Sequence, residues 1–238
     1  MKKIIGLIFL FSVGFMGVYA QDDNADAKQK GAPKKGPQLS ILAGGLFAAD
    51  LSQIKAASNG RDYITDINAV GGGGFIGFDA TYFEAAVSLE GSSSTLKYSG
   101  GYPESTGNYF QAFNLGLSLL CKYPFYFGNI ALFPLLGFEY KIVLSQSLDG
   151  AQLSDSYYKD VLLCTKSDFN TLAVHFGLGA DFAIASKIFL RAELLWGFRA
   201  PNTDDNYYKA VEYNIDPDAN IIHWASVPKI KVAAGYKL

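Results

Sequence analysis

From Leu39 to the end of the chain, apolar residues alternate with polar or small residues in eight segments separated by polar stretches. A period of two is typical of β-strands with one apolar face. Each segment is about as long as a tilted transmembrane strand requires. The pattern therefore predicts eight strands, over residues 39–47, 76–82, 84–90, 113–122, 132–142, 172–182, 188–199 and 229–238.

The connections between these segments alternate in length. Short connections lie around 82–84, 124–129 and 183–187, and the others are long and rich in Ser, Asn, Asp, Gly and Tyr. Tight turns on one side and long loops on the other are the layout of outer-membrane barrels. We therefore expect an all-β protein: an eight-stranded antiparallel up-and-down transmembrane β-barrel over residues 38–238, with both termini in the periplasm. The expected extracellular loops lie near residues 51–72, 92–109, 145–168 and 200–224.

The apolar face must be the outer one, because the interior of an eight-stranded barrel has room for few large side chains. The other face combines Gly, Ala and Ser with a sparse set of charges, which fits a narrow lumen. An unpaired charge in such a lumen would be costly, so we expect paired networks that close the pore, with a gated polar path as the alternative. Glu84, Lys122 and Lys237 also face inward in this pattern, and a position at the periplasmic rim is the alternative for them. The predicted lumen network is Asp79, Glu90, Glu139, Lys141, Asp181, Arg191, Glu193, Arg199, Lys229 and Lys231.

Aromatic residues concentrate where the predicted strands end, which is typical of the girdles at membrane interfaces. The alternative is the ordinary enrichment of aromatics in strands. The expected periplasmic girdle is Tyr82, Phe83, Tyr123, Phe125, Tyr126, Phe127, Phe182, Phe189 and Tyr236. The expected outer girdle is Phe47, Phe75, Phe110, Tyr140, Trp196 and Phe198.

The N-terminus has the features of an export signal. Lys2 and Lys3 precede an apolar run, and the small residues before Gln21 suit cleavage, so residues 1–20 are predicted to be a signal peptide. A retained anchor helix is the alternative. Residues 21–37 are polar and rich in Gly and Pro, and we expect a flexible periplasmic lead-in. Continuous apolar stretches after residue 20 are too short for a membrane-spanning helix.

Composition and the scarce Cys and His residues argue against several classes of function. A net charge of −2 gives no basis for binding nucleic acid. Cys121 and Cys164 fall at opposite ends of the expected barrel, too far apart for a disulfide. No residues have metal-ligand spacing, so we expect neither metal nor cofactor. His175 faces the lumen and His223 lies at a loop–strand boundary, but neither has an evident nucleophile and orienting acid. We therefore expect no enzymatic activity.

Three runs, LAVHFGLGADF, FLRAELLWGFR and the terminal KIKVAAGYKL, resemble the small outer-membrane barrels of the OmpX, OmpA-transmembrane and OmpW type, and spirochaetal members most of all. The resemblance covers roughly residues 38–238. It implies an outer-membrane location and a last strand similar to the signal that the barrel-assembly machinery reads. That signal ends in an aromatic residue in the family, whereas here it ends in Leu. The matching residues are Ile230, Val232, Ala234, Tyr236 and Leu238.

These observations favour a monomeric barrel in outer-membrane lipid, with a charge-plugged lumen. Its role would be structural, or interaction with an extracellular ligand through Tyr-rich polar loops, a composition suited to adaptable contacts. OmpW-like or porin-like passage of small solutes is the alternative function. The resemblance also leaves open a lipid-modifying enzyme.

Overall fold

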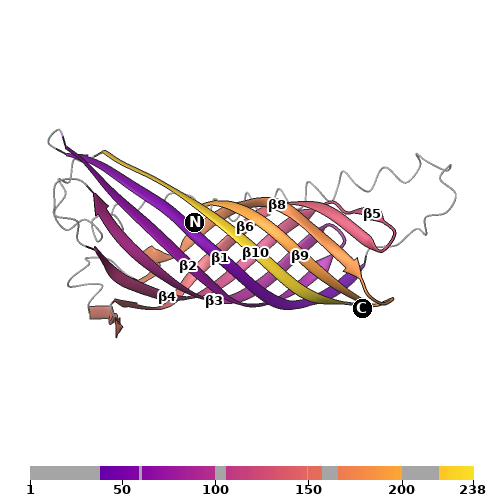
Figure 1. Ribbon diagram of the computed structural model, residues 1–238. Coiled ribbons are helices and arrows are strands. Elements are labelled where there is room, and N and C mark those ends of the chain that lie inside the picture. The colour runs from indigo at the N-terminus through magenta and orange to yellow at the C-terminus, as the bar shows by residue number, and fades with distance from the viewer. Residues whose placement is uncertain (1–37, 59–60, 100–105, 149, 157–165, 200–219) are drawn as a thin grey trace. The chain divides into compact units, whose positions relative to one another are not determined.

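The computed structural model describes residues 38–58, 61–99, 106–148, 150–156, 166–199 and 220–238. Its main body consists of long antiparallel strands tilted around a common axis (Figure 1). No helix within these ranges is long and apolar enough to cross a membrane. The elements are β1 (Leu39–Ser58), β2 (Arg61–Ala80), β3 (Phe83–Ser99), β4 (Thr106–Lys122), β5 (Phe125–Phe127), β6 (Ile130–Leu148), β7 (Ala151–Gln152), the 3-10 helix η1 (Lys166–Phe169), β8 (Thr171–Ala183), β9 (Ile188–Arg199) and β10 (Asn220–Lys237).

The sheet is closed, as the alternating connection lengths predict. Its strands follow the order β4, β3, β2, β1, β10, β9, β8, β6, and β4 pairs with β6 to complete the ring. The first and last strands pair from Ser40 opposite Lys237 to Ala57 opposite Asn220, with a break between Ala48 and Leu51. The fold is therefore an eight-stranded antiparallel β-barrel, to which β5 and β7 add short hairpin extensions on β6.

Tight connections gather at one end of the barrel, which we call the turn end. Thr81 and Tyr82 join β2 to β3, Gly128 occupies the turn between β5 and β6 with a φ of 60°, and residues 184–187 join β8 to β9. Main-chain hydrogen bonds also tie the chain's C-terminal residues to this end, from Leu238 N to Leu39 O at 2.9 Å and from Lys237 N to Lys187 O at 2.8 Å. The opposite end is called the hairpin end below.

The expected long loops are wrong in extent, because the strands continue into them. β1 and β2 each have 20 residues and pair as far as Ser58 opposite Arg61. β3 runs to Ser99, β4 starts at Thr106, β6 ends at Leu148 and β10 starts at Asn220. About ten residues suffice for a transmembrane strand, so these strands extend beyond a membrane-sized wall. Main-chain hydrogen bonds between strands do not require an apolar face. The polar sequence of these extensions therefore shows no alternation that would predict strands.

The outer surface of the barrel is apolar, as predicted. Along β6, β8 and β9, outward positions such as Leu136, Phe176 and Leu194 are exposed, and their sequence neighbours are buried inside. Large apolar side chains exposed on the wall come from every barrel strand. A continuous apolar surface of this kind marks contact with lipid, because soluble proteins rarely expose patches beyond a few hundred Å².

The interior contains more large apolar side chains than the sequence indicated. One cluster comprises Leu42, Leu46, Phe75, Ala86, Phe189 and Ala233. A second comprises Leu120, Phe133, Leu135 and Leu195. Three residues expected in the aromatic girdles therefore lie inside instead: Phe75 and Phe189 are buried, and Phe110 lines a cavity. Each lies an even number of residues from inward residues of its own strand and so shares their face. We call this shared spacing inward parity; it overrides the expectation from a position near a strand end.

The rest of the expected girdles lies outside or at the rim. Phe47, Trp196 and Phe198 are exposed towards the hairpin end, and Tyr123, Phe125 and Phe182 are exposed at the turn end. Tyr126 differs from its neighbours in β5. It pairs with Ala131, an inward residue of β6, so it belongs to the inner face at the mouth of the turn end.

Candidate functional site: the charged lumen

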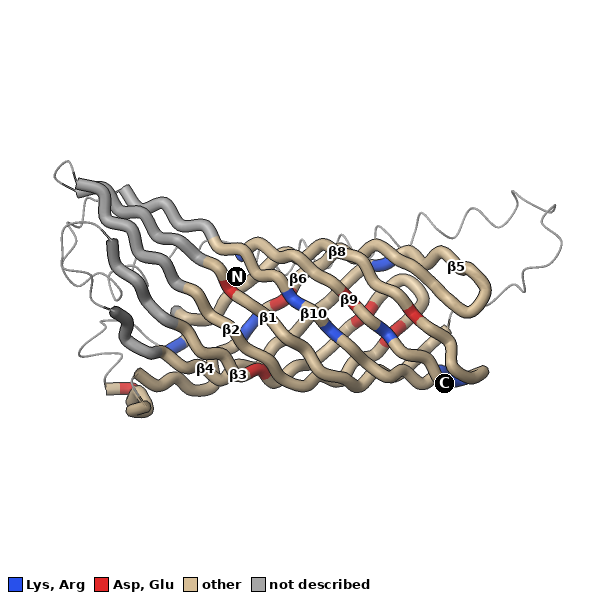
Figure 2. Tube along the Cα trace, in the orientation of Figure 1, with Lys and Arg blue, Asp and Glu red and all other residues tan. Residues whose placement is uncertain are grey.

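Every charged residue assigned to the lumen from sequence lies on the inner face of the barrel, and the structure groups them into two clusters and one pair. Charged positions follow the wall from one end to the other (Figure 2). The turn-end cluster comprises Asp79, Glu84, Lys122, Asp181, Arg191, Glu193 and Lys231. The central cluster comprises Glu90, Glu139, Lys141, His175 and Lys229. The hairpin-end pair is Asp50 with Arg199.

Arg191 is the centre of the turn-end cluster. Its Nε and Nη2 donate to the two carboxylate oxygens of Asp181 at 2.6 and 2.7 Å. Nη1 donates to Asp79 at 2.9 Å and to Glu84 at 2.7 Å, and Nη2 donates to Asp79 at 3.1 Å. A guanidinium has five N–H donors, and all five are used here. Arg191 is only 1% exposed, so its charge is stabilised entirely by protein groups.

The two lysines of the turn-end cluster, Lys122 and Lys231, contact Asp79, Glu84 and Glu193. Lys122 Nζ lies 2.5 Å from Asp79, and Lys231 Nζ contacts Glu84 and lies 2.8 Å from Glu193. Glu84 and Lys122 are buried within the network and do not take the alternative position at the rim. Lys237 is partly exposed near the end of β10, with its Nζ 5.7 Å from the centroid of the Phe189 ring.

Aromatic rings pack against the cations and occupy the space between them. The Arg191 guanidinium lies 5.0 Å from the ring centroid of Phe133 and 5.4 Å from that of Phe189. Lys231 Nζ lies 4.5 Å above the ring of Phe75. Cations within about 6 Å of a ring centroid are attracted by the ring face. The rings therefore favour the charged groups and pack among them inside the barrel.

Glycine on the neighbouring strand makes room for two of these rings. Phe133 pairs with Gly179 across β6 and β8, and Phe189 pairs with Gly235 across β9 and β10. A Cβ on either glycine would lie 2.1 Å from the facing ring. These two inward glycines thus mark where aromatic side chains pack inside the lumen.

The central cluster links opposite walls of the barrel. Lys229 of β10 donates to Glu139 of β6 at 2.5 Å and to Glu90 of β3 at 2.9 Å. Lys141 lies 2.8 Å from Glu90, and His175 Nε2 lies 2.9 Å from Glu139. A void of about 10 Å³ lies between this cluster and the turn-end cluster, lined in part by Ser88 and Ser118. That volume is about enough for one water molecule.

Two lumen residues, Asp50 and Phe133, are not among the predicted lumen positions. Asp50 lies just beyond the expected first strand, yet it has the inward parity of Leu42 and Leu46 and pairs with Arg199. Phe133 likewise has the inward parity of Glu139 on the same strand. Counting every second residue from known inward positions, also beyond the apolar segments, predicts the inward face for both residues. Cys121 is exposed, whereas Cys164 and the side chain of His223 are outside the part that the structure describes.

The closed sheet, the apolar wall and the charged interior define the class of this protein: an eight-stranded β-barrel built inside out, as transmembrane barrels are. No family model matches the chain, and no curated protein matches it.

Solved structures of outer-membrane barrels are similar to it at low identity. OprG from Pseudomonas aeruginosa is 14% identical, with a TM-score of 0.45 and coverage of 84% of this chain and 95% of that one. A major outer membrane protein from Thermus thermophilus is 14% identical, with a TM-score of 0.42 and coverage of 86% and 100%. Neisserial surface protein A is 10% identical, with a TM-score of 0.38 and coverage of 86% and 100%. These values assign no family or function, and the resemblance to spirochaetal members stays a prediction.

Proposed function

We propose that this protein is a monomeric outer-membrane barrel with a closed lumen, which presents extended polar hairpins outside the cell. The predicted signal peptide and the apolar wall support an outer-membrane location, since a closed barrel is the β-structure that satisfies all backbone groups in lipid. In this orientation the turn end faces the periplasm and the hairpin end faces outward. Lipid and, during biogenesis, the barrel-assembly machinery are its proposed partners.

The observation that carries the closed lumen is the turn-end cluster. Its ion pairs connect β2, β3, β4, β8, β9 and β10, and the rings of Phe75, Phe133 and Phe189 occupy the gaps. An ion that enters must displace groups already paired with one another, and removing one partner leaves a buried charge uncompensated. The network therefore serves as a plug.

The role left for such a barrel is structural or adhesive. In sequence, the strand segments beyond the membrane-sized wall are rich in Ser, Asn, Asp and Tyr, a composition suited to adaptable contacts with an extracellular ligand. We propose no catalytic role for His175. Its side chain is 1% exposed and lies beside Glu139 within the central cluster, where no substrate has access.

Planar-bilayer recordings test the proposal. Refolded protein should give no conductance steps at neutral pH, whereas an open porin in the same bilayer gives regular steps. The double variant Phe189→Ala/Arg191→Ala should conduct, because it removes the central cation and one of the rings that fill the lumen. Lys187→Ala, which removes an exposed cation from the turn between β8 and β9, should be as silent as wild type. Regular steps from the wild-type protein would exclude the plug and favour solute passage.

A further inference from the structure

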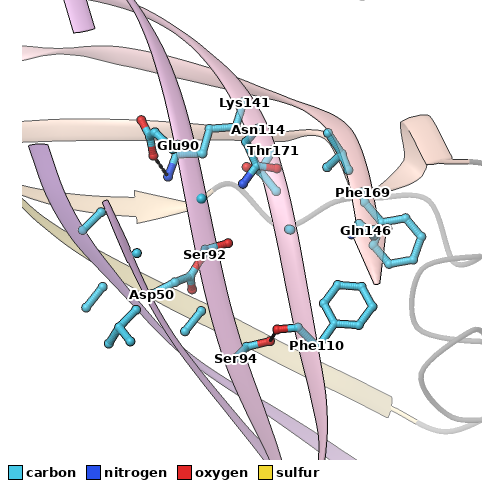
Figure 3. A pocket seen from close by; sticks show the side chains of 18 of the residues that line it. Asp50, Glu90, Ser92, Ser94, Phe110, Asn114, Lys141, Gln146, Phe169 and Thr171 are labelled. Carbon is cyan, nitrogen blue, oxygen red and sulfur yellow. Dashed lines mark hydrogen bonds and ion pairs between the residues drawn. The ribbon is translucent and has the colours of Figure 1, made fainter. Parts of the chain in front are cut away.

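A cavity of about 190 Å³ lies at the hairpin end of the lumen, beyond the ion pair of Glu90 and Lys141 (Figure 3). Polar side chains form part of its lining, and Figure 3 shows Ser92, Asn114 and Thr171 among them. The two clusters of the lumen do not need this space. The cavity is therefore available to a ligand that arrives from the hairpin end, whether or not the lumen conducts.

The cavity lies at the level where the described wall is lowest. β8 begins at Thr171 and β9 ends at Arg199, and both residues line the cavity. The strands on either side continue further, since β6 runs past Lys141, the partner of Thr171, as far as Leu148. Likewise β10 extends beyond Ser226, the partner of Phe198. With the hairpin end outward, as proposed above, the cavity lies on the extracellular side of the two charged clusters.

The charges around the cavity are already paired, which favours a neutral ligand. Lys141 lies 2.8 Å from Glu90, and Arg199 contacts Asp50 through Oδ2. An anion or cation would have to break one of these pairs in a partly dehydrated space. One acceptor remains available: Oδ1 of Asp50 is buried and has no hydrogen-bond partner among the described residues. A buried carboxylate oxygen without a donor is costly, so a ligand with hydroxyl donors would stabilise it.

More of the cavity lining is apolar than polar. Phe110, Phe169 and Val143 contribute apolar surface beside the hydroxyl and amide groups. A ring that carries hydroxyl groups on its edge and C–H groups on its faces matches both kinds of surface. For scale, an engineered cavity of about 150 Å³ holds benzene, so this cavity suits a molecule of roughly monosaccharide size.

We propose that the cavity binds a neutral, polyhydroxylated small molecule of about the size of a pentose or hexose. Asp50 accepts a hydrogen bond from a ligand hydroxyl through Oδ1, and Asn114, Ser92 and Thr171 supply further donors and acceptors. Phe110 and Phe169 contact the apolar face of the ligand. The ligand enters from the hairpin end, and the Glu90–Lys141 pair forms the floor.

Saturation-transfer difference NMR on the full-length barrel, refolded in detergent, tests the proposal. The probes are D-xylose, D-glucose and glycerol, with zwitterionic L-alanine and anionic D-gluconate for comparison. We expect saturable transfer to the neutral probes. Asp50→Asn and Asn114→Ala should each weaken binding by about threefold to tenfold, the value of one hydrogen bond. Ser118→Ala is the matched control, because it lies on the same strand and face as Asn114 but lines the small central void.

Each outcome decides something. Absence of saturable transfer to all three neutral probes overturns the proposal, and stronger binding of alanine or gluconate overturns the ligand class. If Asp50→Asn and Asn114→Ala both bind as wild type does, the site lies elsewhere. A gel-mobility check establishes that each variant is folded, and Ser92→Ala replaces one that is not. Bilayer conductance is measured separately, so failure of the plug is distinguishable from failure of this site.

Discussion

Asp181 and Arg191 lie directly opposite each other on β8 and β9, and their side chains form a bidentate ion pair inside the barrel. The short connection at residues 184–187 determines this register, because two inward positions equally far from a turn face each other. The pair also belongs to a larger network, since Arg191 binds Asp79 and Glu84 of the opposite wall. One side chain thus joins strands that are more than a hundred residues apart in sequence.

We expect Arg191→Ala to destabilise the barrel by up to about 3–5 kcal/mol, the cost of leaving buried charge unpaired. The variant would leave Asp79, Glu84 and Asp181 without their shared cation in a lumen that holds little water. Arg191→Lys should recover only part of this loss, because an ammonium cannot form the bidentate contact. Urea midpoints in detergent measure the effect, with Lys187→Ala as the exposed control. An Arg191→Ala midpoint equal to that of wild type would mean that water reaches these carboxylates.

Gly235→Ala tests whether the aromatic rings need their glycine partners. A Cβ at this position would lie 2.1 Å from the ring of Phe189, and that ring is held beneath the Arg191 guanidinium. We expect a loss of about 1–3 kcal/mol, typical of overpacking. Gly45→Ala is the matched control on the outward face, where a Cβ would meet its nearest atom only at 3.7 Å. In the Phe189→Ala background, Gly235→Ala should cost much less stability, because no ring then meets the added Cβ. Equal unfolding midpoints for the two glycine variants would show that the ring is free to move.

The closed ladder predicts heat-modifiable migration. Each strand of the ring pairs with two neighbours, including β1 with β10 and β4 with β6. The described sheet therefore has no unpaired edge strand at which unfolding could begin in detergent. Unheated protein should therefore migrate differently from boiled protein in SDS gels. Identical migration, or recovery of the protein in the soluble periplasmic fraction, would argue against a transmembrane barrel.

The strand register was predictable because alternation and short turns jointly determine it. Once the turn at residues 184–187 is located, the inward positions of β8 and β9 follow, and Asp181 and Arg191 must meet. The extensions of β1 and β2 beyond Leu51 were not predictable in this way. Their residues alternate in no apolar pattern, and they are paired by main-chain hydrogen bonds that any sequence can form.

The sequence predicts which charged residues face the lumen, but not which of them contact one another. The charges on the inner face followed from parity, whereas the division into two clusters depends on where long side chains reach across the barrel. Lys229, for example, bridges β3 and β6, neither of which is adjacent to β10. Phe75 and Phe189 lie near strand ends, which predicts a place in the girdles, but they have inward parity and are buried. Parity decides in such cases, since a one-residue shift moves a side chain to the other face.

Two turn glycines at opposite ends of the barrel allow a matched test of its orientation. Gly128 lies between β5 and β6 at the turn end, with a φ of 60°, and Gly150 lies between β6 and β7 at the hairpin end, with a φ of 84°. A Cβ on either residue would meet nothing within 4 Å. Both turns are exposed, so an epitope tag inserted at either should be tolerated without loss of the fold.

With the hairpin end outside, an antibody should label intact cells that carry the tag at Gly150. Cells that carry the tag at Gly128 should be labelled only after the outer membrane is permeabilised. The reason is that the strands extend beyond a membrane-sized wall only at the hairpin end. β6 continues towards Gly150 there, whereas at the turn end β5 and β6 are joined by a tight turn at Gly128. Heat-modifiable migration of both tagged proteins serves as the folding control. Labelling of intact cells at Gly128 alone would reverse the orientation, and the 190 Å³ cavity would then open to the periplasm.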